Sequence, residues 1–545
     1  MSDYDIPTNK KLYRLLESVE RDLDISVKGS SNLDINISNI QFDSRRVHPG
    51  SLFVAVAGQH VDGYDFIPEA IRRGASAVVA CKQAKDIHVP FLRVQDTRKA
   101  LAHLSAAFYD YPARKLTVIG VTGTDGKTTT VNLIFEILRS AGFKTGMVTT
   151  VNAILGDQVI DTGFHVTTPE APDIQRYLAS MVSKGITHAV IEATSHGLAQ
   201  KRVDACDFNA AVVTNITHEH IDYHGSIENY RDAKAVLFRK LVAAETTNPK
   251  IAVLNIDDSS YRYLRPILDD HNQLTNKKTL DHVDVISYGL NHSAQVMASD
   301  ILYDISGSSF SVSFRESTFP IVLRLPGKFN IHNCLAAIAL THTGYNIDQT
   351  AIQTGILALK NIPGRMESID MGTDFDTIVD FAHTPNALKS ALETAKAVIV
   401  NRGASGRIIA IFGSAGLRDK QKRRMMAEIS AELADISILT AEDPRTESLD
   451  LILAEMAEGA MDRGGRDGVD YYCIPDRGEA IEFGVSIAQP GDIVMALGKG
   501  HEQSMCFGEI EYPWDDRTAM RAAVAEYLGI DGPKMPYLPS QHERE

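Results

Sequence analysis

A short glycine-rich stretch, Gly120–Thr130, has the residue types of a nucleotide-binding phosphate loop. In the usual loop a glycine is followed by four residues and then by Gly-Lys-Ser/Thr, but the residue five positions before Gly126 is Val121. The glycine that opens the loop is therefore Gly123, which gives a shorter loop. An apolar run precedes this loop and a helical pattern follows it, so backbone N–H groups and a helix N-terminus would meet phosphate oxygens there.

Two side chains of this loop predict its chemistry. Lys127 would neutralise the β- and γ-phosphates of a nucleotide, and Thr128 would hold Mg²⁺. A tight turn that needs glycine only for its shape is the alternative. The apolar run before the loop and the Lys-Thr-Thr-Thr sequence after it favour nucleotide binding, but they do not indicate the reaction.

A second group of polar side chains follows other apolar runs. Glu192 lies near the end of the strand pattern at residues 187–194 and is a candidate metal ligand. Imidazole suits Mg²⁺ only in part, because this ion prefers oxygen ligands. Spacing alone leaves open which side chains of the stretch 214–225 would bind a metal; the candidates are His218, Glu219, His220, Asp222 and His224.

Apolar strand patterns that alternate with helical patterns would position these side chains. Strands that are apolar throughout are typical of a parallel sheet covered on both faces. Because ligands bind at the carboxyl ends of such strands, we expect the loops after the last four strands to converge. The predicted strands are residues 51–58, 76–81, 116–123, 187–194, 208–216, 250–257, 376–383, 406–416, 436–445 and 491–500, and the predicted helices include 66–75, 97–115 and 127–142.

Composition excludes several classes of protein. A chain of 545 residues is too long for a single core and should divide into several domains. The net charge of −15 argues against nucleic-acid binding, and the five cysteines lack the Cys-x-x-Cys pairs of a zinc site. There is no apolar run of membrane-spanning length and no secretory signal, so we expect a cytoplasmic protein without membrane insertion. We expect the polar tail at residues 532–545 to be mobile.

Together with further stretches, these motifs resemble the Mur ligases, and among them the MurE type, the UDP-N-acetylmuramoyl-tripeptide synthetases. The resemblance extends from residue 42 to residue 517, and the shortened loop is this family's form of the phosphate loop. One departure is Asp125, where the family more often has asparagine. The matching stretches are residues 42–63, 122–130, 167–173, 191–203, 214–225, 327–337, 362–369, 379–388, 416–423, 497–502 and 514–517.

The resemblance implies an α/β fold of three domains. These are a small N-terminal UDP-sugar-binding domain at residues 1–110, a central P-loop ATPase-like domain with a parallel sheet at 111–345, and a C-terminal Rossmann-like, amino-acid-binding domain at 346–545. The implied activity is the ATP-dependent addition of a diamino acid to UDP-N-acetylmuramoyl-L-alanyl-D-glutamate in peptidoglycan precursor synthesis. ATP would phosphorylate a substrate carboxylate, an amine would attack the acyl phosphate, and phosphate would leave. We expect a monomer that uses ATP and Mg²⁺.

Position by position, the resemblance assigns roles around the phosphate loop. Lys234 would become a metal ligand by carrying a carbamate formed from carbon dioxide, because a plain lysine would repel the metal; a surface lysine on a helix is the alternative. The catalytic residues would be Lys127, Glu192, His220 and Lys234, and the metal ligands Thr128, Glu192, His220 and Lys234. ATP would be contacted by Gly123, Thr124, Asp125, Gly126, Lys127, Thr128, Thr129, Asn330, Asn333, Arg365 and Asp380.

Two of these ATP-contacting residues, Asn330 and Asn333, are three positions apart and could share a helical face. A helix cap is the alternative role for an asparagine.

The resemblance also assigns the two remaining substrates. The UDP-muramoyl dipeptide would be held by Phe42, Ser44, Gln59, His60, Val61, Thr167, Thr168, Thr194, Gln200 and Arg202. The incoming diamino acid would be surrounded by Arg418, Glu442, Asp443, Pro444, Arg445, Gly498 and Glu502.

The identity of the diamino acid depends on the loop at residues 441–448. Arg445 has the planar guanidinium that pairs with the distal carboxylate of meso-diaminopimelate, which L-lysine and L-ornithine lack. Against this, Asp443 stands where ligases for meso-diaminopimelate usually have asparagine, and its anion would suit a terminal ammonium. We favour meso-diaminopimelate, with L-lysine or L-ornithine as the alternative.

Two more distant functions compete with this interpretation. A folylpolyglutamate or cyanophycin type synthetase shares the central domain, but the N-terminal sugar-nucleotide stretches argue against it. A non-catalytic scaffold that binds ATP would not need Lys127, His220 and Lys234 together.

Overall fold

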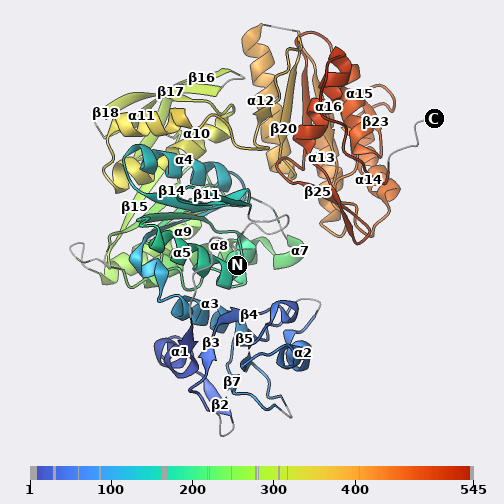
Figure 1. The fold of residues 1–545 in the computed structure, drawn as a ribbon. Coiled ribbons are helices and arrows are strands. Elements are labelled where there is room, and N and C mark those ends of the chain that lie inside the picture. The colour runs from blue at the N-terminus through green and yellow to red at the C-terminus, as the bar shows by residue number, and fades with distance from the viewer. Residues whose placement is uncertain are drawn as a thin grey trace.

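The computed structural model describes residues 9–28, 32–58, 61–84, 87–161, 168–217, 219, 221–246, 248–275, 279, 281–291, 293–304, 307–315, 317–403 and 405–540. Three α/β regions follow one another along the chain, coloured blue, then teal to yellow, then orange to red in Figure 1. Each region is built on its own sheet, and the sheets are largely parallel, as expected. The exact domain limits at residues 110 and 345 stay predictions.

The N-terminal region has a five-stranded sheet in the order β2-β7-β6-β5-β4 among its described residues. All neighbours are parallel except β2 and β7. The strands are β2 (Ser26–Lys28), β4 (Asn39–Gln41), β5 (Ser51–Val54), β6 (Ala77–Ala80) and β7 (Phe91–Arg93), with a small pair β1 (Lys10–Lys11) and β3 (Asn36–Ile37). The helices are α1 (Leu12–Val19), η1 (Ser44–Arg46), η2 (Gly63–Phe66), α2 (Ile67–Arg72) and α3 (Thr97–Phe108).

Helix α3 is shorter than the predicted stretch 97–115. It begins at the cap residue Asp96 and ends at Phe108, because Asp110 and Tyr111 both have a left-handed backbone with φ of 58° and 50°. A separate turn, η3 (Pro112–Lys115), then leads into the central region.

The central region contains an eleven-stranded sheet, counted over the described residues, in the order β11-β10-β9-β12-β8-β13-β14-β15-β16-β17-β18. The seven central strands, β9, β12, β8, β13, β14, β15 and β16 in sheet order, are parallel. The two edges are antiparallel hairpins that the sequence did not predict. The strands are β8 (Thr117–Thr122), β9 (Thr145–Val148), β10 (Asn152–Leu155), β11 (Gln158–Asp161), β12 (His188–Glu192), β13 (Ala210–Val213), β14 (Lys250–Asn255), β15 (Val283–Gly289), β16 (Val296–Asp304), β17 (Gly307–Phe314) and β18 (Ser317–Leu323).

Helices cover both faces of this central sheet (Figure 1). The reason is visible in β8, where Val118 packs into the core on one face and Ile119 into the core on the other, since successive strand residues point in opposite directions. One face is covered by α4 (Lys127–Ser140), α10 (Lys328–Ile338), η4 (Ala339–Gly344) and α11 (Gln349–Ala358). The other is covered by α5 (Ala171–Ser183), α8 (Ile227–Ala243) and α9 (Ser260–Leu274), with the short helices α6 (Ser195–Ala199) and α7 (Ile221–His224) nearby.

The C-terminal region has a six-stranded sheet, over its described residues, in the order β19-β20-β24-β21-β22-β23. Its strands β20, β24, β21 and β22 are adjacent and parallel, which confirms that the four predicted loops lie at one edge. The strands are β19 (Glu367–Ser368), β20 (Asp376–Asp380), β21 (Ile408–Phe412), β22 (Ile436–Leu439), β23 (Tyr471–Cys473) and β24 (Ile493–Leu497), with a hairpin of β25 (Ser504–Phe507) and β26 (Ile510–Pro513). The helices are α12 (Pro385–Arg402), α13 (Lys420–Leu433), α14 (Leu449–Asp462), α15 (Arg477–Ser486) and α16 (Asp516–Leu528).

Part of the C-terminal tail packs against this region, so the prediction of a mobile tail is wrong for that part. Leu538 is buried, and the hydroxyl of Ser540 donates to the Asp476 carboxylate at 2.9 Å.

None of the helices in the described ranges is both long enough and apolar enough to cross a membrane.

Candidate active site

The phosphate loop has a shape that only glycine allows at two positions. A Cβ atom on Gly123 would lie 1.8 Å from the Thr214 hydroxyl oxygen, and one on Gly126 would lie 2.1 Å from the Asn333 side-chain oxygen. Gly126 also has a φ of 81° and immediately precedes the first residue of α4. The loop therefore fits tightly between the end of β13 and helix α10.

Neighbouring residues hold the loop by its backbone. The N–H of Thr124 donates to the carbonyl of Asn215 at 2.8 Å, and the N–H of Asp125 donates to the Asn215 side chain at 3.0 Å. The hydroxyl of Thr214 donates to the carbonyl of Asp125 at 2.6 Å. These bonds hold the loop directly before α4, whose first-turn N–H groups have no partners within the helix and are suited to bind phosphate oxygens.

Lys127 and Thr128 begin helix α4, as predicted. The Lys127 ammonium donates to the carbonyl of Thr124 at 2.7 Å, so its charge lies over the loop. The Thr128 hydroxyl donates to the carboxylate of Glu192 at 2.9 Å, and both side chains are buried. Glu192 ends β12, the strand next to β8, and its carboxylate also accepts the N–H of Thr150 at 3.1 Å.

Lys234 lies next to this pair. It is only 1% exposed, so the alternative of a surface lysine is wrong. Its amine donates to the carbonyl of Gly123 at 2.5 Å and lies 4.5 Å from the centre of the Tyr230 ring. Burial lowers the pKa of Lys234 well below its ordinary value, and the neighbouring Lys127 acts in the same direction.

The histidine-rich stretch is only partly described. His220, which the resemblance makes a metal ligand, lies outside the described residues, as do His218 and the side chain of Asp222. Over the part of the chain that the structure describes, His, Cys, Asp and Glu side chains form no group of three that could hold a metal ion. Two of the predicted metal ligands, Thr128 and Lys234, are not of these four residue types.

Helix α10 presents Asn330 and Asn333 on one face, as their spacing predicts. The Asn333 amide donates to the Asn330 side-chain oxygen at 3.1 Å, and the Asn330 amide donates to the carbonyl of Pro326 at 2.7 Å. The helix is capped by Gly327, so neither asparagine is a cap. Asn333 also lines a cavity of about 460 Å³ beside the phosphate loop, together with Asn215, Asp257, His332 and Asn386.

The C-terminal region reaches the central region through three side chains, two of them at the phosphate loop. Arg365 approaches the Thr128 hydroxyl to 3.5 Å and lies over the Phe381 ring. The Asn386 amide, in the first turn of α12, donates to the Asp125 carboxylate at 3.2 Å, and His383 lies 3.4 Å from the Glu219 carboxylate. These contacts, which the sequence did not predict, join the two regions into one site.

Arg365 has an unsatisfied donor in this position. Its Nε is buried and has no hydrogen-bond partner within the described residues. Asp380 supports the turn that carries it, because the Asp380 carboxylate accepts the N–H groups of Met366 at 2.6 Å and Ala382 at 2.8 Å. Burial raises the pKa of Asp380, and the Arg365 charge opposes this. A buried guanidinium N–H without a partner is suited to a phosphate oxygen.

A second cluster lies between the central and N-terminal regions. The Thr168 hydroxyl donates to the carbonyl of Glu192 at 3.0 Å and lies 2.9 Å from the hydroxyl of Thr194, the cap of α6. Arg202 donates to the carbonyl of Thr168 at 2.7 Å and to the Gln200 side chain at 2.6 Å. Arg98 of α3 lies 3.4 Å from Gln200. Four predicted sugar-peptide residues are thus brought together beside Glu192.

The other predicted sugar-nucleotide residues lie in the N-terminal region or are not described. Phe42 directly follows β4, Ser44 begins η1, and Val61 is exposed. Gln59, His60 and Thr167 lie outside the described residues.

The predicted amino-acid loops lie at the carboxyl ends of β22 and β24. Glu442 is buried, and its Oε2 has no hydrogen-bond partner in the described part of the chain. A Cβ on Gly498 would lie 2.6 Å from that oxygen, and Gly498 has a φ of 113°, a backbone conformation that favours glycine. Arg418 is exposed at the end of the β21 loop, and Pro444 lies against Gly416 of the same loop.

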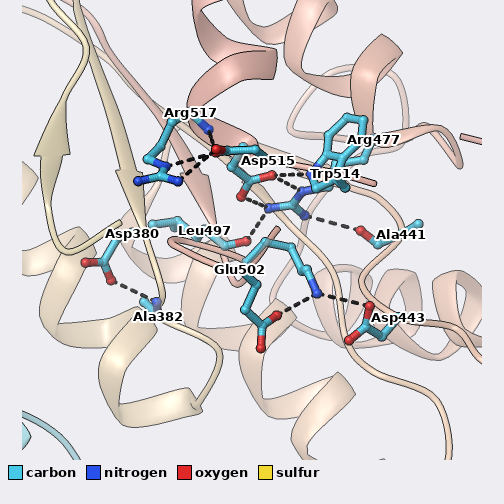
Figure 2. A network of polar contacts seen from close by, with 12 residues as sticks. Asp380, Ala382, Ala441, Asp443, Arg477, Leu497, Glu502, Trp514, Asp515 and Arg517 are labelled. Atoms are coloured by element: carbon cyan, nitrogen blue, oxygen red, sulfur yellow. Dashed lines mark hydrogen bonds and ion pairs between the residues drawn. The ribbon is translucent and has the colours of Figure 1, made fainter. Parts of the chain in front are cut away.

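The most connected side chain among these loops was not predicted. Lys499 forms ion pairs with Glu502 at 2.5 Å and with Asp443 at 3.0 Å, and Figure 2 shows both carboxylates converging on one ammonium. A lysine between two glycines directly after a buried strand was the available signal. Arg477, which binds Asp516 in the same network, gave no such signal, because it lies in an ordinary helix start.

Comparison with known proteins gives consistent matches along the chain. The models of the Mur ligase family catalytic domain, the Mur ligase middle domain and the Mur ligase glutamate ligase domain match residues 36–109, 121–341 and 364–500. A UDP-N-acetylmuramyl-tripeptide synthetase from Roseiflexus sp. (strain RS-1) is 41% identical over 91% of this chain and 96% of its own length.

A further curated relative and a solved structure agree. A UDP-N-acetylmuramoyl-L-alanyl-D-glutamate–2,6-diaminopimelate ligase from Geobacillus kaustophilus (strain HTA426) is 38% identical over 90% of this chain and 95% of its own length. A solved structure described as a ligase of that same name is 29% identical, covers 92% of this chain and 97% of its own, and superposes with a TM-score of 0.62.

Proposed function

The chain belongs to the Mur ligase family, and from this premise we propose that it joins a diamino acid to UDP-N-acetylmuramoyl-L-alanyl-D-glutamate with ATP as the energy source. The product would be a precursor of peptidoglycan. The names of the relatives at 38% and 41% identity support this substrate, and meso-diaminopimelate is the diamino acid that we favour.

One observation of the site carries the proposal. Arg365 belongs to the region that holds the amino-acid loops, yet it lies 3.5 Å from Thr128 of the phosphate loop and has a buried Nε without a partner in the described chain. A site that handles both a nucleotide and an amino acid needs such a contact between the two regions, because the reacting groups must be held in line.

The first step transfers a phosphoryl group to the substrate. A carboxylate oxygen of the dipeptide attacks the γ-phosphorus of ATP, the bond from that phosphorus to the ADP oxygen breaks, and an acyl phosphate forms. Like charges meet in this step, so cations must offset them. Lys127 would supply one, and the Arg365 guanidinium, with its unpartnered Nε among the described residues, would donate to a phosphate oxygen.

The second step forms the amide bond. The unprotonated amine of the diamino acid attacks the acyl carbon, its nitrogen loses one proton, and phosphate leaves with the former carboxylate oxygen. Glu442 would accept a hydrogen bond from an amino group of this substrate; its Oε2, which has no partner in the described part of the chain and lies beside Gly498, supports this role. The cavity of about 460 Å³ beside Asn333 would hold the nucleoside part of ATP.

The residues around Glu192 fit a magnesium ion. A carboxylate and a hydroxyl 2.9 Å apart are oxygen ligands of the kind that Mg²⁺ prefers. We propose that Thr128, Glu192, His220 and a carbamate on Lys234 hold it. When bound, Mg²⁺ would neutralise charge on the phosphates. Burial of Lys234 beside the loop supports the carbamate, because only an unprotonated amine adds carbon dioxide, with loss of one proton.

The remaining assignments follow the same substrates. Thr168, Thr194, Gln200 and Arg202 would hold the dipeptide end of the nucleotide sugar beside Glu192, and the N-terminal residues would hold its uridine end. ATP and a nucleotide sugar support a cytoplasmic location. We propose that the protein acts as a monomer.

The test uses purified protein with ATP, Mg²⁺, UDP-N-acetylmuramoyl-L-alanyl-D-glutamate and one diamino acid at a time. We expect phosphate release that depends on the diamino acid, and a product mass equal to the sum of both substrates less one water. Lys127→Ala should lower kcat by about 10²–10³-fold, the scale for one group that stabilises transition-state charge. If none of the diamino acids tested causes phosphate release, the proposal is contradicted and a scaffold is favoured.

A further inference from the structure

Lys499 is a buried cation between two carboxylates. Its side chain is 1% exposed, and its ammonium lies 2.5 Å from Glu502 and 3.0 Å from Asp443 (Figure 2). Burial opposes the charged form, but the two carboxylates together raise the pKa of Lys499 above its ordinary value. Both carboxylates are therefore paired with the Lys499 ammonium within the protein.

Asp443 is engaged on a second side. The oxygen that binds Lys499 also accepts the backbone N–H of Cys506 in β25 at 2.9 Å. Asp443 has a left-handed backbone with φ of 42°, and its carbonyl accepts the N–H of Gly416 at 3.0 Å. Two donors on one carboxylate oxygen and a bonded backbone fix Asp443 in this position.

Arg445, two residues further along, is left without such partners. Its backbone is fixed, because its N–H donates to the carbonyl of Cys506 at 3.0 Å and its carbonyl accepts the N–H of Gly508 at 2.7 Å. Its half-buried guanidinium makes no hydrogen bond or ion pair with another described residue. It is therefore the cation of this loop that remains available to a ligand.

A second buried cation, Arg477, holds the backbone at the start of the two loops that carry Asp443 and Lys499. Arg477 donates to the carbonyl of Ala441 at 3.2 Å and to that of Leu497 at 2.9 Å, and it forms a paired contact with Asp516 at 2.7 and 2.6 Å (Figure 2). Ala441 begins the loop that carries Asp443 and Arg445, and Leu497 ends the strand before Lys499. Both loops thus start from strand ends held by one guanidinium.

On this geometry, and resting on the proposed function, we infer that Lys499 is a positioning residue that determines which diamino acid is used. By holding Asp443 it keeps this anion from pairing with Arg445, two residues away in the same loop, and by holding Glu502 it keeps that carboxylate from pairing with a terminal ammonium. Arg445 is then free to bind a carboxylate at the distal end of the substrate. A diamino acid with that carboxylate is selected, and one that ends in a bare ammonium, such as L-lysine, is disfavoured.

The test compares two buried lysines that are each changed to methionine. Lys499→Met frees both carboxylates, so we expect the ratio of kcat/KM for meso-diaminopimelate to that for L-lysine to fall by at least about tenfold, mainly through a higher KM for meso-diaminopimelate. Lys499→Arg should keep the ratio. Lys250→Met is the matched control, because Lys250 is 2% exposed in the central sheet and donates to the carbonyl of Val242; its ratio should equal that of the wild type.

A double variant separates the charge effect from a loss of packing. Lys499→Met with Asp443→Asn removes the freed anion of the Arg445 loop and leaves Glu502 freed, so it should recover part of the wild-type ratio. It also provides a folded comparison if Lys499→Met alone does not fold. Three results would each overturn this inference and leave the proposed ligase function intact. They are an unchanged ratio in Lys499→Met, no recovery in the double variant, and a wild type that prefers L-lysine. A wild type that uses no diamino acid would overturn the proposed function as well.

Discussion

Lys234 is the residue whose chemistry depends most on its surroundings. As a plain amine it is buried against the carbonyl of Gly123, at 2.5 Å, and beside Glu192. We predict that Lys234→Ala is nearly inactive and that a short aliphatic acid partly restores turnover by standing in for the carbamate. Intact-protein mass measured under carbon dioxide should show one added carbon dioxide in the wild type.

The control for this prediction lies on the same helix. Lys240 is paired with Asp204 at 2.9 Å, away from the phosphate loop, and Lys240→Ala should keep activity and show no response to the acid. Full activity of Lys234→Ala in the absence of any acid would exclude the carbamate.

At this scale the sequence predicted what is local. The phosphate loop from Gly123 to Thr128 could be predicted because its residues are adjacent. Glu192 could be predicted as a metal ligand because it ends an apolar strand. The contact of Asn386 with Asp125 could not be predicted, since the two residues are 261 positions apart in the chain. The charge of Asp443 was ambiguous for the same reason, because its partner Lys499 is 56 residues away.

Among the elements, the strand ends that carry the amino-acid loops depend on Arg477. Arg477 and Asp516 are both fully buried, and the Trp514 indole N–H also donates to Asp516 at 2.8 Å. Arg477→Met would leave that carboxylate buried without its charge partner, so we predict a loss of about 3–5 kcal/mol in the free energy of unfolding, measured by urea titration.

An exposed arginine in the loop between α14 and β23 of the same region provides the comparison. Arg466 pairs with Asp470 at 2.7 Å at the surface, where water screens the interaction, so Arg466→Met should leave the unfolding free energy unchanged. Equal stability of the Arg477 and Arg466 variants would show that the buried pair does not hold the loops.

The sequence was informative about elements that are apolar throughout. The strands β8, β12 and β24 were predicted because a buried strand of a parallel sheet is a continuous apolar run. The hairpin of β17 and β18 was missed, because its alternating residues carry a weaker signal and lie at the sheet edge. The early end of α3 depends on the left-handed backbone at Asp110, which propensity does not reveal.

For the whole molecule, acid stability should depend on His188. This residue begins β12, its ring lies 4.6 Å from that of Phe143, and burial lowers its pKa from 6.5 to about 4. The folded state therefore favours the neutral ring. This contribution to stability is complete above the unfolded pKa of 6.5 and is lost as the pH falls toward 4.

We predict that the urea midpoint of the wild type falls between about pH 7 and about pH 5 by more than that of His188→Gln, which has no ring to protonate. Identical pH profiles for the two proteins would show that another group controls acid unfolding.

The arrangement of the three regions was beyond the sequence, although the regions themselves were not. Arg365, His383 and Asn386 join the C-terminal region to the central region at and beside the phosphate loop, through contacts of 3.2 to 3.5 Å. Each contact pairs residues distant in the chain, so only the folded molecule reveals that the predicted nucleotide and amino-acid sites form one site.

The central claim is that ATP activates a substrate carboxylate before the amine attacks. The most direct measurement uses UDP-N-acetylmuramoyl-L-alanyl-D-glutamate whose reacting carboxylate is labelled with ¹⁸O, with purified protein, ATP, Mg²⁺ and meso-diaminopimelate. Because the carboxylate oxygen that attacks phosphorus leaves with the phosphate, the account predicts one ¹⁸O atom in each phosphate released, read by mass spectrometry. Phosphate that carries no label, released at the rate of product formation, would contradict it.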